Sequence, residues 1–500
     1  MSQVSLLAPL LEHARTRPEH IAVRGPRADQ RTSLTYRQFV GAIAARTREL
    51  QASGLRPGER VGLIAPTCPE FLIEFLAVEA CGAITVCFNP LSTVPELDFV
   101  LSDSGASHLI MHPLCPEAGS AAAEALGITA ELLTPVDMHA LPQASPDFAP
   151  VTRDPEDCVL LLYTSGTTGR PKGAMLSART LLTGVTAAEA VAGLSPADRA
   201  GTALPLFHVF GLGSVAYPVL ANGATITLLP RFDADELLET IIADELTIVA
   251  GVPTMWNALT HATAGEGVTT PQLRLALSGG AAISLELMRA FHARFGASIT
   301  EGYGLTETCA FGTFNAAEGE DKIGSVGLPA PTMDVRIVDP ATGEACGPGQ
   351  TGEVRLCGPL VMLGYWNRPE ATAEVFDADG FFCTGDLGHV DEDGYLYIVD
   401  RLKDLIIHGG YNVYPREVEE VLYAHPQVFE AAVIGAADEH YGQQVAAVVT
   451  PMPGTELTGD EIEAWCRQSL SAYKIPRIIR IVDGLPKGPT GKIRKRSIEL

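Results

Sequence analysis

The chain has 500 residues, of which 46% are hydrophobic and 19% are charged, a composition typical of a globular protein rather than a disordered one. This length exceeds the usual size of one hydrophobic core, so we expect at least two domains. The formal net charge of −25 argues against nucleic acid or an anionic membrane as the main partner, because both favour a basic surface.

The ten cysteines are scattered and form no CxxC pair, so the sequence does not indicate a zinc or dithiol site. We expect free thiols, as in a reducing compartment, and therefore a cytoplasmic protein. The N-terminus carries charges early and lacks the pattern of a signal peptide. No stretch of about 18 uninterrupted apolar residues occurs, which disfavours stable insertion in a membrane.

Strand and helix signals alternate along the first part of the chain. Thr35 and Gln38 fit a capping box that begins a helix. Arg60–Ala65 reads as a strand, Pro69–Cys81 as a helix and Ala83–Phe88 as the next strand. Together these three segments predict a βαβ unit with two buried parallel strands.

The same alternation continues further along the chain. Strands or helices are predicted at Val159–Tyr163, Ala224–Leu229, Leu237–Asp244, Thr247–Ala250 and Leu285–Phe295. The segment Pro113–Pro150 is rich in Ala, Pro and Glu, and its prolines predict short surface pieces rather than long elements.

A second, smaller unit is predicted from about Arg401 onward. Its expected elements are a helix at Pro415–Ala424, strands at Phe429–Gly435 and Gln444–Thr450, and a helix at Gly459–Leu470. We therefore expect an α/β fold with a large multi-sheet N-terminal domain over residues 1–400 and a small α+β domain over residues 401–500.

The run Tyr163–Gly173, which reads YTSGTTGRPKG, is the most informative segment of the chain. Its glycines allow backbone N–H groups to converge on an anion, and Lys172 adds a mobile positive charge suited to phosphate. A buried strand precedes the run, and α/β sheets hold nucleotides at such strand ends. The spacing differs from that of the Walker A loop, so the sequence predicts another kind of phosphate loop.

Seven motifs follow one another along the chain: YTSGTTGRPKG, FHVFG, EGYGLTET, GFFCTGD, DRLKD, GGYNVYPREVE and PTGKIRK. In this order they resemble the adenylate-forming superfamily, which holds acyl-CoA synthetases, peptide-synthetase adenylation domains and beetle luciferases. The resemblance spans nearly the whole chain. It implies that a carboxylic acid is activated with ATP and Mg²⁺ and passed to CoA, and that the small domain is mobile and turns between the two steps.

The resemblance also implies which residues bind the nucleotide: Thr164, Ser165, Gly166, Thr167, Thr168, Gly169, Lys172, Gly280, Ala281, Glu301, Gly302, Tyr303, Gly304, Thr306, Asp386, Arg401 and Lys492. Within this set, the segment from Thr164 to Lys172 would hold the β- and γ-phosphates, and Tyr303 would lie against adenine. Asp386 and Arg401 would contact the ribose.

Four residues carry the implied catalytic roles: Lys492, His208, Glu307 and Thr164. Glu307 would hold Mg²⁺, since a carboxylate suits a hard cation shared with phosphate oxygens. Lys492 would bridge the substrate carboxylate and the α-phosphate, where a cation stabilises developing charge. His208 would lie near the carboxylate, although a lone histidine among apolar residues is also typical of a protein core.

The remaining implied residues concern the second step. Lys403 matches the hinge position, where a few residues absorb a backbone change. Gly409, Gly410 and Tyr411 match the loop that faces the pantetheine arm of CoA after the small domain has turned.

The acid is expected to be apolar, because Phe210, Val252, Met255 and Trp256 lie in segments that resemble the walls of an acyl pocket. A medium- or long-chain fatty acid is the first choice and an aryl or polycyclic acid the second. Four alternatives remain: delivery to a carrier-protein thiol, a single half-reaction, a luciferase-like oxidase, and a binding protein without turnover. A homodimer is one option for the oligomeric state, which the sequence leaves open.

Overall fold

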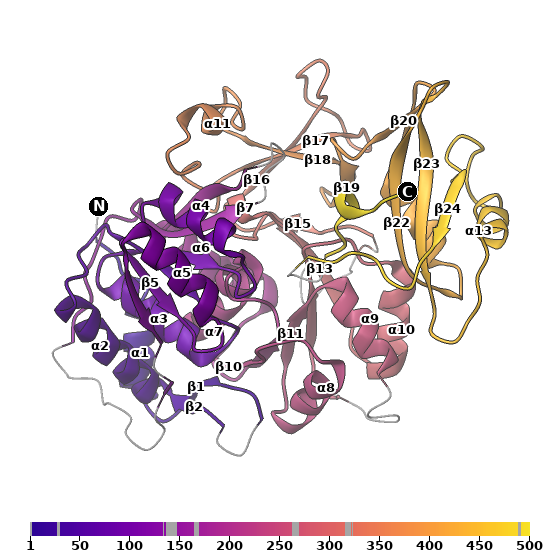
Figure 1. The fold of residues 1–500 in the computed structure, drawn as a ribbon. Coiled ribbons are helices and arrows are strands. Elements are labelled where there is room, and N and C mark those ends of the chain that lie inside the picture. The colour runs from indigo at the N-terminus through magenta and orange to yellow at the C-terminus, as the bar shows by residue number, and fades with distance from the viewer. Residues whose placement is uncertain are drawn as a thin grey trace.

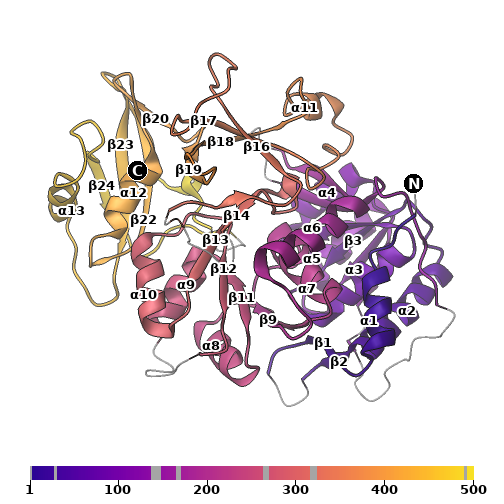
Figure 2. The same cartoon turned by 180° about the vertical axis from the view of Figure 1, so that it is seen from behind.

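The computed structural model describes residues 3–27, 31–133, 135–136, 148–164, 170–262, 270–315, 322, 324–488 and 492–500. It shows a large mixed α/β body with a smaller C-terminal unit at one side (Figure 1). Helices α1 (Ala8–Thr16), α2 (Tyr36–Ala52) and α3 (Pro69–Ala80) lie at the side of the body away from that unit (Figure 2). The predicted fold class, a large multi-sheet α/β domain followed by a small domain, is confirmed.

The first sheet has six strands in the order β6-β5-β3-β4-β7-β8. Strands β3 and β4 are parallel and are joined by α3, which confirms the predicted βαβ unit. The predicted capping box is also present, because Gln38 N donates to Thr35 Oγ1 and Thr35 N donates to Gln38 Oε1 at the start of α2. The elements of this layer are β3 (Arg60–Ile64), β4 (Ile84–Phe88), β5 (His108–Met111), β6 (Thr129–Leu132), β7 (Cys158–Thr164), β8 (Lys172–Ser177), α4 (Val94–Ser104), α5 (Pro116–Leu126) and α6 (Ala178–Ala192).

The prediction of short surface pieces over Pro113–Pro150 was wrong for its first half. Helix α5 runs for 11 residues, buries Ala122 and Ala123, and leads into β6, which pairs with β5. The helix tolerates Pro116 because a proline in the first turn lacks only an N–H that would have no partner within the helix. Residues 137–147 of the segment lie outside the described residues.

The predicted phosphate loop closes a β-hairpin. Strands β7 and β8 are antiparallel, and Thr164 at the end of β7 pairs with Lys172 at the start of β8. The two ends of the loop are therefore fixed side by side by sheet hydrogen bonds. Residues Ser165–Gly169 lie outside the described residues.

The second sheet has nine strands in the order β15-β14-β13-β12-β11-β9-β10-β1-β2. Helix α8 begins three residues earlier than predicted, because Asp233 caps it by accepting from the backbone N–H groups of Asp235 and Glu236. The elements are β1 (Ile21–Arg24), β2 (Ser33–Thr35), β9 (Arg199–Thr202), β10 (Thr225–Leu228), β11 (Ile248–Gly251), β12 (Leu275–Ser278), β13 (Ile299–Tyr303), β14 (Thr313–Phe314), β15 (Leu328–Pro329), α7 (Tyr217–Ala221), α8 (Ala234–Ala243), α9 (Pro253–His261) and α10 (Leu285–Phe295).

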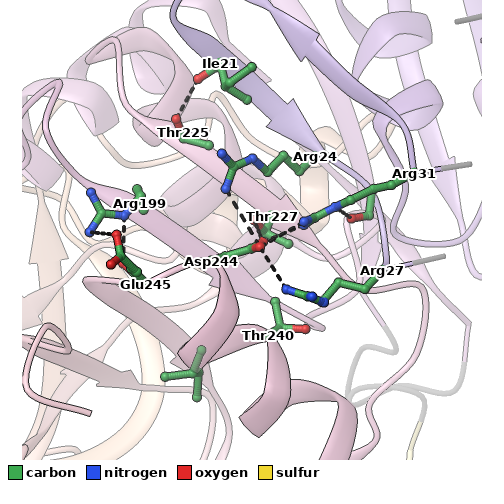
Figure 3. A network of polar contacts seen from close by, with 12 residues as sticks. Ile21, Arg24, Arg27, Arg31, Arg199, Thr225, Thr227, Thr240, Asp244 and Glu245 are labelled. Atoms are coloured by element: carbon green, nitrogen blue, oxygen red, sulfur yellow. Dashed lines mark hydrogen bonds and ion pairs between the residues drawn. The ribbon is translucent and has the colours of Figure 1, made fainter. Parts of the chain in front are cut away.

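A buried carboxylate ties the far edge of this sheet to α8 (Figure 3). Asp244, which directly follows the helix, accepts from Arg31 Nη1 at 2.8 Å and from Thr227 Oγ1 at 2.9 Å. Arg24 and Arg27 bring further guanidinium nitrogens to 3.8 and 3.7 Å. The Asp244 side chain is only 3% exposed, so its charge depends on these partners.

A third sheet of four antiparallel strands, in the order β16-β17-β18-β19, completes the large body. Its strands are β16 (Asp334–Val338), β17 (Gly352–Cys357), β18 (Phe382–Val390) and β19 (Leu396–Arg401), and the short helix α11 (Pro369–Ala373) precedes β18. The chain leaves β19 at Arg401 and enters the C-terminal unit through residues 402–405.

The C-terminal unit has a hydrophobic cluster of its own, from Ile406 to Ile475. Strand β22 is longer than predicted and α13 ends at Cys466, earlier than predicted. Its elements are β20 (Ile406–His408), β21 (Tyr411–Val413), β22 (Val428–Asp438), β23 (Gly442–Pro451), β24 (Ile478–Ile481), α12 (Pro415–Tyr423) and α13 (Gly459–Cys466). The boundary at residues 400 and 401 stays a prediction.

Within the part of the chain that the structure describes, no helix combines the length and the apolar character needed to cross a bilayer.

Candidate active site

Lys492 reaches from the C-terminal unit to the large body. A Cβ built on Gly280 would lie 2.8 Å from Lys492 Cε and 3.3 Å from Nζ, so the lysine side chain lies directly against this glycine. Gly280 follows β12 with φ of +82°, a conformation that favours glycine. Ala281, beside it, is exposed. Burial, with Arg401 as the next cause, lowers the pKa of the Lys492 ammonium to about 8.

Asp386, Tyr303 and Arg401 form one connected group. Tyr303 Oη donates to Asp386 Oδ2 at 2.6 Å, and Arg401 Nε lies 3.1 Å from Asp386 Oδ1. The register of the third sheet explains the ion pair, because Asp386 on β18 is directly opposite Arg401 on β19. Burial raises the pKa of Asp386, and Arg401 is the main group that opposes this rise. The structure therefore brings the three predicted ribose and adenine residues together.

Tyr365 joins the residues predicted to meet phosphate and metal. Its hydroxyl donates to Glu307 Oε1 at 2.9 Å, and Lys172 Nζ lies 5.1 Å from the centre of its ring. Its backbone forms an antiparallel bridge with Ala174 on β8, which fixes it beside the phosphate hairpin. The motifs did not single out Tyr365, and no local signal in GYWNRPE could have placed it between a lysine and a glutamate from two other segments.

The turn that carries Glu307 is strained. Thr306 begins a short 3₁₀ turn, Thr306–Thr308, and the next two residues, Cys309 and Ala310, have φ of +53° and +60°. Side chains in this left-handed region cost roughly 1–2 kcal/mol per residue. Such strain persists only where the surrounding structure enforces it, and it often marks a functional site. Burial raises the pKa of Glu307, while Tyr365 opposes the rise.

Gly302 and Gly304, on either side of Tyr303, allow neighbouring segments to pack closely against the backbone. A Cβ on Gly302 would lie 2.3 Å from a carbon of the Phe314 ring, and a Cβ on Gly304 would lie 2.3 Å from the backbone carbon of Ala310. The two glycines therefore let β13 approach β14 and the strained turn more closely than any side chain would allow.

His208 is under the electrostatic influence of Lys492. Burial lowers the pKa of His208 to about 3, and the charge of Lys492 is the second cause. The imidazole is therefore neutral at pH 7, and its Nδ1 accepts a hydrogen bond from Phe210 N at 3.2 Å. This contact leaves the proton on Nε2. The histidine therefore interacts electrostatically with Lys492 and also accepts a hydrogen bond from the apolar segment that follows it.

An apolar cavity of about 30 Å³ lies behind this cluster. Phe210, Phe311 and Phe314 form its aromatic walls, and the other lining residues are Ala188, Val191, Ala192, Leu194, Ser214, Val215, Val219, Ile248 and Leu277. Phe210 also packs against Gly279, where a Cβ would lie 3.2 Å from its ring. The cavity therefore begins one side chain away from Gly280 and Lys492. Of the predicted wall residues, Phe210 lines this cavity, whereas Val252, Met255 and Trp256 do not.

Glu301 is buried beside the cluster rather than inside it. Its Oε1 accepts from Ile283 N at 3.2 Å, which fixes the loop that follows Gly280. Burial raises the pKa of Glu301 to about 7, and Arg416 of α12 is the largest opposing influence.

The residues predicted for the second step lie in the linker between the two units and at the β20–β21 turn. Lys403 is in the linker, where partial desolvation, with Arg401 as the next cause, lowers its pKa. Gly409 and Gly410 form the tight turn between β20 and β21, both with positive φ. Tyr411 is 61% exposed and packs on the Tyr473 ring of its own unit, with the ring centres 4.9 Å apart.

The chain matches two family models over most of its length. The model described as AMP-binding enzyme matches residues 10–366, and the model described as AMP-binding enzyme C-terminal domain matches residues 417–492. A feruloyl-CoA synthase from an Amycolatopsis species is 41% identical over 98% of this chain and 97% of its own length. A long-chain-fatty-acid–CoA ligase from Bacillus subtilis is 36% identical over 93% and 89%.

The solved structures agree with these relatives. The ATP-bound form of MatB from Rhodopseudomonas palustris superposes with a TM-score of 0.91 at 33% identity, over 99% of this chain and 98% of that one. The apo form of the same protein superposes with a TM-score of 0.81, at the same identity and the same coverage of both chains. The present arrangement of the chain is thus closer to the ATP-bound form. An ATP and magnesium complex of o-succinylbenzoate CoA synthetase from Bacillus subtilis, 30% identical over 99% of both chains, gives 0.85.

The motifs, the fold and the relatives lead to one family assignment. The chain belongs to the AMP-binding enzyme family and is an AMP-forming acid–thiol ligase.

Proposed function

We propose that the protein is an acyl-CoA synthetase that adenylates an apolar carboxylic acid with ATP and then transfers the acyl group to CoA. The observation that carries the proposal is that Lys492 lies against Gly280, while Phe210, which packs against the neighbouring Gly279, forms a wall of an apolar cavity. The charge of Lys492 acts on His208, and the charge of Asp386 acts on Lys492.

In this proposal the nucleotide is held at two points. Asp386 accepts hydrogen bonds from the ribose hydroxyls and Arg401 keeps the carboxylate in place, while the ring of Tyr303 lies against adenine. Thr164, Lys172 and the loop Ser165–Gly169 hold the outer phosphates. The donor set fits Mg²⁺ at Glu307, because its buried carboxylate is a hard oxygen ligand held by Tyr365 beside the phosphate lysine. When bound, the ion would neutralise charge on the phosphate oxygens.

In the first step the substrate carboxylate attacks the α-phosphorus and pyrophosphate leaves. Lys492 supplies a positive charge where negative charge builds up on the α-phosphate, in a buried site where such a charge acts strongly. Neutral His208 donates from Nε2 and orients the carboxylate. Catalysis here consists of positioning and charge stabilisation.

In the second step the C-terminal unit turns about Lys403, withdraws Lys492 and brings the Gly409–Tyr411 turn to the pocket. The CoA thiol then attacks the acyl carbonyl and AMP leaves. One observation supports a movable unit: the C-terminal unit has a hydrophobic core of its own.

For the acid we favour a flat aryl acid over a long fatty acid, which reverses the order expected from the sequence. Three walls of the cavity are phenyl rings, which stack well on an aromatic acid. The 41% identity to a feruloyl-CoA synthase supports the same choice.

The experiment measures the two steps separately with a panel of aryl and fatty acids. Exchange of labelled pyrophosphate into ATP reports adenylation, and CoA thioester formation reports the whole reaction. Lys492→Ala should abolish most of the exchange but spare thioester formation from supplied acyl-adenylate. Lys322→Ala, which removes a lysine that pairs with Asp391 and does not line the cavity, is the matched control. If no acid supports exchange in the unaltered protein, the proposal is wrong.

A further inference from the structure

Arg416 crosses the boundary between the large body and the C-terminal unit. It is the second residue of α12, and its side chain is 13% exposed. Its Nη1 donates to the carbonyl of Ile398 at 2.6 Å, and its backbone N donates to Asp400 Oδ2 at 2.9 Å. Both acceptors lie on β19 of the large body. Rotation of the C-terminal unit about residues 402–405 must therefore break these two hydrogen bonds.

The charge of the same arginine acts on a buried acid that is incompletely paired. Glu301 is 3% exposed, and its Oε2 has no hydrogen-bond partner among the described residues. Of the charges around it, Arg416 is the one that most favours its ionised form, whereas Glu420, also on α12, opposes it. A buried carboxylate that loses its compensating cation is strongly disfavoured. Withdrawal of Arg416 would leave Glu301 in that state.

Glu301 is also part of the structure around the reacting groups. It lies on β13 two residues before Tyr303, and it fixes the loop after Gly280 through Ile283 N. The charge of Arg416 thus acts on a residue that joins β13 to the loop after Gly280, the glycine against which Lys492 lies. A second contact joins the units at the same interface, from Asn257 Nδ2 on α9 to the carbonyl of Phe429 on β22 at 3.3 Å.

We propose that Arg416 is a positioning residue for adenylation: it holds the C-terminal unit in the arrangement that places Lys492 against Gly280, and it must be released before the thioester step. This inference rests on the proposed function. The guanidinium suits the role because its fork reaches Ile398 and Glu420 at once, and its charge persists at every relevant pH.

The test compares the two half-reactions in the full-length protein. Arg416→Met keeps the side-chain length but removes the charge and the donors. We expect pyrophosphate exchange to fall about ten-fold or more, which is the effect of one charge-assisted hydrogen bond. Thioester formation from supplied acyl-adenylate should stay the same or rise. Arg467→Met, directly after the end of α13, where the arginine pairs with Glu463 among the described residues, should change neither rate.

Two further variants keep the test decisive if the methionine variant is unstable. Arg416→Lys retains the charge near Glu301 but loses the fork, so exchange alone should fall, by less than in the methionine variant. Arg416→Met with Glu301→Gln removes the uncompensated acid and should restore thermal stability but not exchange.

An equal loss in both half-reactions would show a merely structural role and overturn the inference, as would unchanged exchange. These outcomes differ from a failure of the proposed function, in which the unaltered protein would show no acid-dependent exchange at all.

Discussion

The contact between Gly280 and Lys492 predicts the effect of a single added methyl group. In Gly280→Ala the new Cβ would lie 2.8 Å from Lys492 Cε. Carbon atoms in contact lie about 3.5–4.0 Å apart, so the two atoms would overlap by at least about 0.7 Å. The lysine is the flexible partner and would move away.

Two effects of this change can be separated. Because Gly280 has a positive φ, the alanine variant should have a free energy of unfolding lower by roughly 1–2 kcal/mol. The displacement of Lys492 should lower the rate of pyrophosphate exchange about 100-fold, since a misplacement of about 1 Å at a reacting centre can have that effect. Thioester formation from supplied acyl-adenylate should be unchanged, because Lys492 has no part in it.

Gly296→Ala is the matched control. Gly296 ends α10 with φ of +72°, and a Cβ there would meet nothing within 4 Å. It should lose a similar amount of stability, measured by thermal unfolding, without loss of exchange. If the two variants exchange pyrophosphate at the same rate, the position assigned to Lys492 is wrong.

Three more predictions follow from the described contacts. The charge of Lys492 is fully present below its pKa of about 8 and is lost above it, so kcat/KM for exchange should fall as the pH rises through about 8. Lys492→Arg should lack this alkaline decrease, and a profile of the unaltered protein that stays flat well above pH 8 would contradict a pKa of about 8 for Lys492. Tyr365→Phe keeps the ring under Lys172 but removes the hydrogen bond to Glu307, so half-maximal exchange should need about ten-fold more MgATP. The control Tyr395→Phe, whose ring lies under Lys322, should behave like the unaltered protein. Asp244→Asn leaves three arginines facing one another, so it should lower the free energy of unfolding by about 3–5 kcal/mol in urea denaturation without changing the exchange rate of the folded protein. The control is Glu12→Gln at an exposed ion pair, and equal stability of the two variants would show that the contacts of Asp244 drawn in Figure 3 do not stabilise the fold.

The sequence by itself determined the features that are written in short contiguous segments. The βαβ unit, the capping box at Thr35 and helix α10 depend on local patterns of apolar and capping residues, and they were predicted close to their observed bounds. The family was likewise carried by contiguous motifs and is confirmed by the comparisons. The roles of the motif residues stay predictions.

Only the tertiary structure decided which segments meet. Tyr365 between Lys172 and Glu307 and Lys492 against Gly280 join residues far apart in the chain, and Arg416 on Ile398 joins the two units. Such contacts depend on the order of the strands in the sheets and on how the two units are docked, and neither leaves a periodic trace in the sequence around any one of the partners. The shape of the apolar cavity is decided in the same way, since Phe210 comes from a segment of the chain remote from Phe311 and Phe314.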